Sequence, residues 1–254
     1  MRKPIVGGNW KMHKLVGEAV QTVEALKPLV AEVYDVDIVV CPTFTALYSV
    51  VQAARGSNVQ AGAQNCYKEE KGAFTGEIAP QMIADTGAQW AVIGHSERRH
   101  VFGETDQLLN EKVKYVLANT GLNVIFCIGE TIDERKSGAM EDVLKRQVGE
   151  GLAGLSEEDF SRVVVAYEPV WAIGTGETAT PEQAEEAHAF TRGIIESDFG
   201  GAVAEKLRIQ YGGSVKPNNA AELIAKPNVD GFLVGGASLE ADSFAAIIKA
   251  ASAK

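Results

Sequence analysis

The sequence of 254 residues lacks the features of membrane-bound and disulfide-stapled proteins. No apolar run approaches the ~18 residues that a membrane-spanning helix requires. The stretch after residues 1–4 is too short for the apolar core of a signal peptide. The three cysteines, Cys41, Cys66 and Cys127, are odd in number and widely spaced, which favours reduced thiols over a disulfide framework. We therefore expect a cytoplasmic protein.

Metal and nucleic-acid signatures are also missing. CxxC and HExxH spacings do not occur, and the four histidines are dispersed, so we expect no metal. The formal net charge of −10 argues against a diffuse basic surface for nucleic acid or an anionic membrane. An anionic substrate must therefore be attracted by local groups, such as a lysine or the N–H groups at a helix end.

The sequence does contain a regular alternation of short β-branched runs and longer amphipathic segments. Several runs are almost wholly apolar, such as 38–40 and 163–166, as expected of parallel strands covered on both faces. The expected strands are residues 5–8, 37–41, 58–63, 89–93, 122–128, 163–167, 207–211 and 231–234. The expected helices lie near residues 15–29, 44–54, 78–87, 106–118, 140–152, 181–198, 218–225 and 239–250.

These segments form eight strand-then-helix units at a spacing of about 30 residues. Eight is the number of strands that closes a parallel barrel, although an open doubly wound sheet shows the same alternation. The units are even in length and no linker divides the chain. We therefore favour an α/β fold, a (β/α)₈ barrel of eight parallel strands surrounded by helices, with residues 1–254 forming a single domain.

Polar side chains follow several of the expected strands. Asn9 and Lys11 follow the first strand, His95 the fourth, Glu168 the sixth and Ser214 the seventh. Ligands of parallel barrels bind at the carboxyl ends of the strands, so these side chains are expected on one rim. Taken singly, each has an ordinary structural interpretation, such as a solvated loop carboxylate or a histidine buried in the core. Their joint placement favours acid–base catalysis.

Glycines follow the last two strands, in Gly212-Gly213-Ser214 and in Gly235-Gly236. Barrels commonly hold phosphate in the loops after strands seven and eight, so these glycines predict a phosphate site. A second pattern, Gly174–Ala179, superficially fits the dinucleotide-binding sequence. It begins seven residues beyond the strand end at Tyr167 rather than opening a helix, so we expect no nicotinamide cofactor and no other cofactor.

The segment after Glu168 has the composition of a mobile lid. Its apolar, glycine-containing tip is unusual for a surface loop unless the loop closes over a ligand. The expected lid residues are Pro169, Val170, Trp171, Ala172, Ile173, Gly174, Thr175, Gly176, Glu177, Thr178 and Ala179.

Five motifs follow one another along the chain: Gly8–Met12, Ile93–Arg99, Tyr167–Gly176, Tyr211–Val215 and Val234–Ala237. In their sequence, order and spacing they resemble the triosephosphate isomerase family. The resemblance covers residue 5 to the C-terminal helix and implies a TIM barrel. It also implies the reversible interconversion of dihydroxyacetone phosphate and D-glyceraldehyde 3-phosphate through an enediolate, in glycolysis and gluconeogenesis.

The resemblance also implies roles for individual residues. Glu168 is expected to be the base, a neutral His95 the electrophile, and Lys11 the cation that faces the phosphate and the developing enediolate, with Asn9 orienting the same group. The phosphate-binding N–H groups are expected in Gly174, Ser214, Gly235 and Gly236. Tyr211 is expected to hold the lid shut near Ala179, and Trp171 to hydrogen-bond to Glu130 when the lid opens.

Two further expectations follow from the resemblance. The loop 64–77 is long for a strand-to-helix connection, and in the family it inserts the equivalent of Thr75 into a second subunit near Lys11 and His95. A homodimer is therefore expected, against the alternative of a flexible surface loop. One departure concerns Glu177, where the family often carries lysine; because a hinge residue does not touch substrate, we expect lid kinetics to change more than chemistry.

Two alternatives stay open on the residues alone. Another phosphate-binding barrel isomerase, of tryptophan or histidine biosynthesis, would explain the glycine loops but not the set of Lys11, His95 and Glu168. A catalytically silent barrel that only binds a ligand would be expected to have lost at least one of those three residues, and all three are present.

Overall fold

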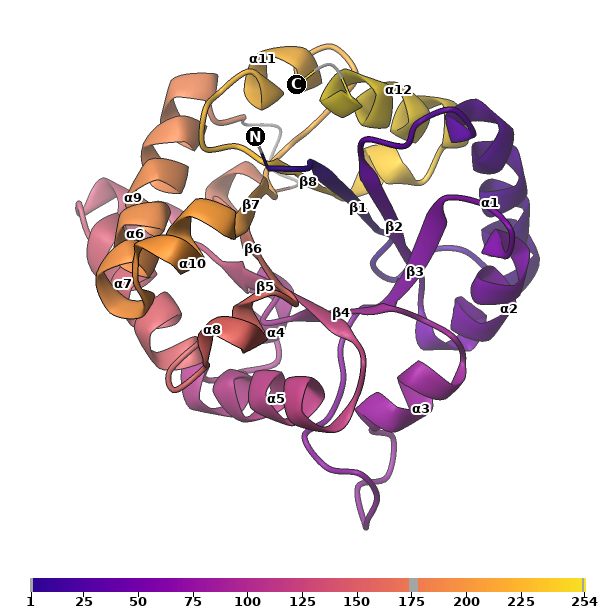
Figure 1. Cartoon of the computed structure of the whole chain (residues 1–254), viewed down its shortest axis with the longest axis horizontal. Coiled ribbons are helices and arrows are strands. Elements are labelled where there is room, and N and C mark those ends of the chain that lie inside the picture. The colour runs from indigo at the N-terminus through magenta and orange to yellow at the C-terminus, as the bar shows by residue number, and fades with distance from the viewer. Residues whose placement is uncertain (1, 174–177, 253) are drawn as a thin grey trace.

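The computed structural model describes residues 2–173, 178–252 and 254, and its centre is a closed ring of eight parallel strands (Figure 1). The strands are β1 (Ile5–Asn9), β2 (Asp37–Cys41), β3 (Val59–Ala63), β4 (Trp90–Ile93), β5 (Asn123–Ile128), β6 (Val163–Tyr167), β7 (Arg208–Tyr211) and β8 (Gly231–Val234). Each strand pairs with the next in the chain, and β8 pairs with β1. The open-sheet alternative is thereby excluded, and the predicted (β/α)₈ barrel is confirmed.

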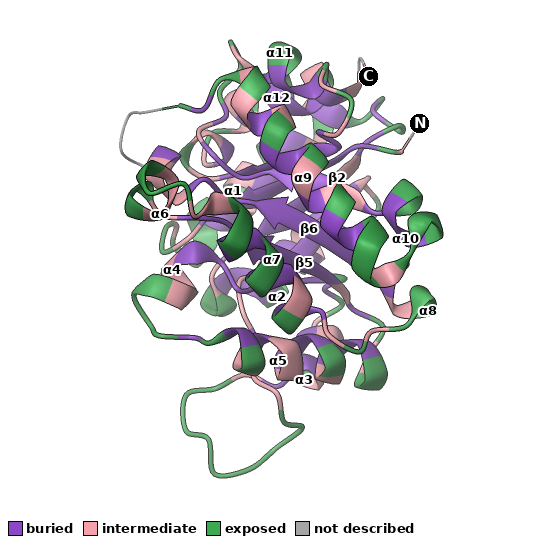
Figure 2. Ribbon diagram, turned by 90° about the vertical axis from the view of Figure 1, so that its left-hand side faces the viewer, coloured by how far each residue is buried: buried purple, intermediate pink, exposed green. Residues whose placement is uncertain are grey.

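Side-chain alternation along the strands divides the apolar residues into two layers. In β6, Val164 and Ala166 belong to a cluster inside the barrel, whereas Val163, Val165 and Tyr167 pack against the surrounding helices. Both faces of such a strand are covered, which explains why its sequence is almost continuously apolar. Figure 2 shows the buried strands at the centre and the exposed residues on the outer faces of the helices.

The helices form the outer layer around the ring. They are α1 (Val16–Val30), α2 (Phe44–Ala54), α3 (Pro80–Asp85), α4 (Ser96–His100), α5 (Asp106–Asn119), α6 (Ile132–Lys136), α7 (Met140–Gly151), α8 (Glu157–Phe160), α9 (Pro181–Phe199), α10 (Gly201–Lys206), α11 (Ala220–Ile224) and α12 (Ala241–Ser252). Two short 3₁₀ turns, η1 (Val170–Ala172) and η2 (Gly236–Ser238), follow β6 and β8. No described helix is both long enough and apolar enough to cross a bilayer.

The connection between β3 and α3 extends away from the barrel as a long loop (Figures 1 and 2). Residues 69–77 are all exposed. The base of the loop is closed by a hydrogen bond from the Tyr67 N–H to the Ile78 carbonyl at 2.9 Å, and the rings of Tyr67 and Phe74 lie 4.6 Å apart. The loop therefore has internal contacts, and Thr75 within it is exposed.

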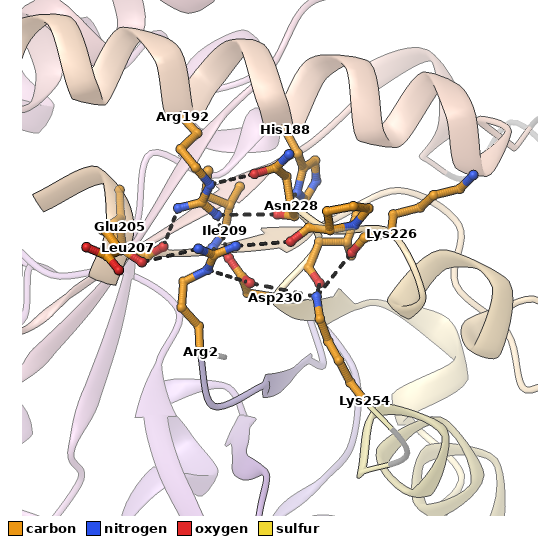
Figure 3. A network of polar contacts seen from close by, with 12 residues as sticks. Arg2, His188, Arg192, Glu205, Leu207, Ile209, Lys226, Asn228, Asp230 and Lys254 are labelled. Carbon is orange, nitrogen blue, oxygen red and sulfur yellow. Dashed lines mark hydrogen bonds and ion pairs between the residues drawn. The ribbon is translucent and has the colours of Figure 1, made fainter. Parts of the chain in front are cut away.

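A polar network joins both ends of the chain at the amino-terminal end of the barrel (Figure 3). Asp230, which is buried, accepts hydrogen bonds from Arg2 at 2.8 Å and from Arg192 at 2.7 Å. Lys254 Nζ lies 3.8 Å from the same carboxylate. The network lies at the opposite end from the carboxyl ends of the strands, where residues serve stability rather than catalysis.

The three cysteines are free and buried. Burial raises the pKa of the Cys41 and Cys66 thiols to about 12, so both are protonated and unreactive at neutral pH.

Candidate active site

The predicted rim residues meet in one cavity of about 250 Å³ at the carboxyl ends of the strands. Asn9 is the last residue of β1, and Glu168 directly follows β6, so each continues the side-chain alternation of its strand into the barrel mouth. The described residues predicted for catalysis or substrate binding that line this cavity are Asn9, Lys11, His95, Glu168, Ser214, Gly235 and Gly236, and the predicted lid contributes Ala172 and Ile173. Gly174, the remaining predicted phosphate ligand, lies outside the described residues.

Glu168 and His95 are in direct contact at the centre of the cavity. Nε2 of His95 lies 2.9 Å from Oε1 of Glu168, and the side chain of Glu168 is only 2% exposed. The second carboxylate oxygen accepts a 2.8 Å hydrogen bond from the backbone N–H of Ser96, the first residue of α4. Both oxygens of the carboxylate are therefore occupied by donors of the protein.

The two groups shift each other's pKa in opposite directions. Burial raises the pKa of Glu168, but the neighbouring His95, the Ser96 N–H and Lys11 more than offset it, and the net shift is downward. Burial lowers the pKa of His95, but the Glu168 carboxylate more than offsets it, and the net shift is upward. Each shift is the one expected when an opposite charge lies within hydrogen-bond distance.

The hydrogen bonds of the His95 ring favour one neutral tautomer. The backbone N–H of Glu97 points at Nδ1 at 3.2 Å, an arrangement that requires Nδ1 to be an acceptor without a proton. The proton of the neutral ring then lies on Nε2, facing Glu168. The geometry at Nδ1 thus opposes the protonation that the Glu168 carboxylate favours. A protonated Nδ1 would face the Glu97 N–H donor, so the hydrogen-bond geometry keeps the ring neutral.

Lys11 is held in the cavity by an unusual backbone and by three contacts. Its φ of 51° is in the left-handed region, which non-glycine residues rarely adopt. The Lys11 N–H donates to Asn9 Oδ1 at 3.1 Å, and Gln64 Nε2 donates to the Lys11 carbonyl at 2.8 Å. The ammonium group donates to Glu97 Oε1 at 2.7 Å. The position of this cation is therefore fixed from both its main chain and its side chain.

The glycine loops bring main chain close to the cavity. A Cβ on Gly212 would lie 2.8 Å from Cγ of Glu168, and one on Gly213 would lie 2.2 Å from the Tyr211 hydroxyl. Only glycine allows these approaches. Ser214 is fixed behind them, because Asn219 Nδ2 donates to its carbonyl at 3.1 Å. Across the cavity, Gly235 precedes the 3₁₀ turn η2, and residues of both glycine loops line the same space.

The start of the expected lid is anchored to Glu130, which follows β5. The Trp171 indole N–H donates to Glu130 Oε1 at 2.9 Å, as predicted, and the Tyr167 hydroxyl donates to the same oxygen at 3.0 Å. The lid residues Gly174, Thr175, Gly176 and Glu177 lie outside the described residues. The contact expected between Tyr211 and Ala179 stays a prediction. Burial raises the Tyr211 pKa to about 12, and the nearby Ala179 N–H partly opposes this rise, but among the described residues the hydroxyl makes no hydrogen bond of full geometry.

Ser96, Glu97 and Gln64 contact the central residues but are not among the predicted site residues. The sequence signal that could have identified Ser96 and Glu97 as site residues is their position, because they directly follow His95 and begin α4. Within the described parts of the chain, no group of three or more histidine, cysteine or acidic side chains is arranged to hold a metal.

A closed parallel barrel with an acid–base pair, a fixed cation and glycine loops at the carboxyl ends of its strands belongs to the class of (β/α)₈-barrel enzymes. The sequence matches the family model described as triosephosphate isomerase over residues 4–251. It is also 53% identical over 249 residues to a triosephosphate isomerase of Carboxydothermus hydrogenoformans, an alignment that covers 98% of this chain and 99% of the relative. A triosephosphate isomerase of Clostridium perfringens is 54% identical over 98% of this chain and 99% of its own length. The chain belongs to the triosephosphate isomerase family.

Proposed function

We propose that the chain interconverts dihydroxyacetone phosphate and D-glyceraldehyde 3-phosphate, in glycolysis and gluconeogenesis, with Glu168 as the base. The observation that carries the assignment of roles is the buried contact between Glu168 and His95 at 2.9 Å, in a cavity that also holds Lys11. A glutamate base paired with a neutral electrophilic histidine is the established mechanism of the family.

In this mechanism Glu168 removes a proton from one substrate carbon and returns it to the neighbouring carbon. The carboxylate must first leave the Ser96 N–H and the His95 ring, since both of its oxygens are occupied in this structure. Leaving these donors removes two of the groups that lower its pKa. A carboxylate with a higher pKa in the dry cavity is a stronger base, so the same movement that brings Glu168 to substrate increases its basicity.

His95 polarises the substrate carbonyl and moves protons between the two substrate oxygens. The movement of Glu168 away from the ring also removes the larger of the two carboxylate charges that raise the His95 pKa, the other being that of Glu97. The Glu97 N–H stays on Nδ1 and keeps the ring neutral, with the Nε2 proton available for donation. A neutral imidazole can then give a proton to one oxygen and accept one from the other.

Lys11 supplies the positive charge that the enediolate and the phosphate require, and Asn9 orients the same group. The enediolate carries negative charge on oxygen, and a fixed cation in a cavity that excludes water stabilises such a charge strongly. N–H groups of Ser214, Gly235 and Gly236, together with the undescribed Gly174, bind the phosphate. Residues 169–179 form the lid, which excludes water from the intermediate. No cofactor and no metal take part in the proposed reaction.

The active unit is proposed to be a homodimer. A cavity of about 280 Å³ adjoins the site and is lined by Lys11, His95, Glu97, Gln64 and Phe102, among others. This is the neighbourhood into which the loop tip of a second copy would bring its Thr75. Exposed apolar side chains support an interface, notably Met12 at 91% exposure and Phe102 at 63%.

Two coarser features complete the proposal. Residues 1–254 form one domain, which is supported by the pairing of β1 with β8 across the whole length of the chain. The protein acts in the cytoplasm, which is supported by its buried reduced thiols.

A coupled assay with D-glyceraldehyde 3-phosphate tests the reaction. The purified protein is expected to turn over this substrate, and Glu168→Ala is expected to lose nearly all activity. Absence of turnover by the unmodified protein, or full activity of Glu168→Ala, would contradict the proposal. The same result would reopen the two alternatives of a different phosphate-binding barrel isomerase and a silent binding barrel.

A further inference from the structure

One buried glutamine outside the cavity holds the main chain next to the base. Gln147 lies on α7, is 3% exposed, and makes two hydrogen bonds to a single residue, Gly129. The Gly129 N–H donates to Gln147 Oε1 at 2.7 Å, and Gln147 Nε2 donates to the Gly129 carbonyl at 3.1 Å. The side-chain amide therefore satisfies both polar groups of one buried peptide residue, as a neighbouring strand would.

Gly129 directly follows β5, at the point where the main chains of two segments are closest. A Cβ at this position would lie 1.8 Å from the carbonyl oxygen of Glu168. The residue also has a φ of 156°, which side-chain-bearing residues rarely adopt. Only glycine is compatible with both conditions, and a glycine has no side chain of its own to fix its position.

The segment that contains Gly129 is hydrogen-bonded through its main chain to the segment that begins at Glu168. The Glu168 N–H donates to the Ile128 carbonyl at 2.7 Å, and the Val170 N–H donates to the Glu130 carbonyl at 3.0 Å. Residues 128–130 and 168–170 thus continue the β5–β6 pairing past the ends of both strands. A displacement of Gly129 would move the main chain of Glu168 with it.

We propose that Gln147 is a positioning residue for the isomerisation: by fixing Gly129 it sets the main-chain position of Glu168. The proposal rests on the role of Glu168 as the base. Of the proposed phosphate-binding residues, those that the structure describes, Ser214, Gly235 and Gly236, lie on the loops after β7 and β8, whereas the hydrogen bonds of Gln147 go to Gly129, after β5. Loss of the two hydrogen bonds between Gln147 and Gly129, here called the Gln147–Gly129 clamp, should therefore lower the rate of the chemical step more than it weakens substrate binding.

Gln147→Met removes both hydrogen bonds and keeps a side chain of similar length. We expect kcat to fall about 10- to 100-fold, because a misplacement of the base by about 1 Å can cost that much. KM should change by less than about threefold, since the ground-state contacts are kept.

Gln210→Met is the matched control. Gln210 is a fully buried glutamine in the barrel interior, and its Nε2 donates to the carbonyls of Ile5 and Phe232 at 3.2 and 2.9 Å. The substitution removes two hydrogen bonds to main chain, as Gln147→Met does, but none of them involves residues 128–130 or 168–170. We expect a lower Tm with kcat within about twofold of the unmodified enzyme.

Gln147→Glu supplies a readout that a purely structural role would not move. The new carboxyl has the shape of the amide, but it can donate to the Gly129 carbonyl only when protonated. Burial raises the pKa of such a carboxyl. The ratio of variant kcat to unmodified kcat should therefore fall as the pH rises from about 6 to 9, whereas the amide does not titrate.

Steady-state kinetics and thermal unfolding of the three variants test whether Gln147 positions Glu168. A kcat loss of at least about tenfold in Gln147→Met, absent in Gln210→Met, together with the pH-dependent ratio in Gln147→Glu, supports the proposal. It is overturned if Gln147→Met keeps kcat within about twofold, if both methionine variants lose kcat equally, or if the ratio for Gln147→Glu is constant with pH. Should the unmodified protein fail to turn over the triose phosphate, or Glu168→Ala be fully active, the proposed function itself is wrong. Turnover that is lost in Glu168→Ala but kept in Gln147→Met rejects only the role of Gln147.

Discussion

The backbone N–H of Ser96 donates to Oε2 of Glu168 at 2.8 Å, which joins the first residue of α4 to the end of β6 across 72 residues of sequence. This bond and the His95 contact hold the carboxylate in one orientation before substrate arrives. The proposed role of Glu168 as the base requires its carboxylate to reach a second position, on the substrate carbon.

Glu168→Asp tests whether the length of the Glu168 side chain is critical for its proposed role as the base. The shorter side chain places its carboxylate about 1 Å farther from the substrate carbon, and such a shift can cost about 10²-fold in rate. We expect kcat to fall by about this factor while KM changes little, because Glu168 does not bind the phosphate. Steady-state assays in both reaction directions measure the effect. A kcat within about threefold of the unmodified enzyme would show that the position of the carboxylate is not critical.

Lys11→Met tests the need for a fixed cation. Methionine keeps an apolar stem but removes the ammonium group that lies 2.7 Å from Glu97. Because the proposed role of this charge is to stabilise both the enediolate and the phosphate, we expect kcat/KM to fall by at least about 10²-fold. Lys249→Met, on the exposed face of α12, removes the same charge far from the cavity and should leave kcat/KM unchanged. Equal losses in the two variants would point to net charge rather than to a local role.

Thr75→Arg tests the proposed dimer. The tip of the β3–α3 loop is exposed in the single chain, so the substitution should not disturb folding of the barrel. A bulky cation does not fit a cavity that already contains Lys11 and Arg98. We expect sedimentation at half the assembled mass and a reduced kcat. A monomer with full activity, from either the variant or the unmodified chain, contradicts the proposal that the dimer is the active unit.

The fold could be predicted from the sequence because nearly all the strand signals are local. The runs at 37–41 and 163–167 match β2 and β6 residue for residue, because a short, almost wholly apolar run is typical of a parallel strand covered on both faces. The short helices α6 and α8 were not predicted, although capping boxes at Thr131 and Ser156 mark their starts. Helices of five and four residues are too short to show an apolar period.

The site was predictable in part. Parallel strands end at the same rim, so the placement of Asn9, His95 and Glu168 follows from topology alone. The Ser96–Glu168 bond and the Gln147–Gly129 clamp could not be foreseen, because each depends on how an outer helix packs against a strand end. No local pattern in the sequence predicts how an outer helix packs against a strand end.

The pH dependence of stability should contain a contribution from His188, a buried histidine of α9. Its Nδ1 lies 3.1 Å from the Asn228 carbonyl, and its ring packs against Tyr167 at a centroid distance of 5.7 Å. Burial lowers its pKa from 6.5 to about 4. Between these two values the unfolded chain binds a proton that the folded chain does not, so the free energy of unfolding falls as the pH falls through this window.

The size of this contribution follows from the two pKa values. A difference of about 2.5 units corresponds to about 3 kcal/mol, of which about 2 kcal/mol should already be lost at pH 5. His188→Asn keeps a donor for the Asn228 carbonyl but removes the titrating ring. Urea unfolding at pH 7.5 and pH 5 should show the variant losing about 2 kcal/mol less than the unmodified protein between the two pH values. Equal losses would mean that His188 is protonated in the folded protein near its ordinary pKa, and that its ring is not sealed from water.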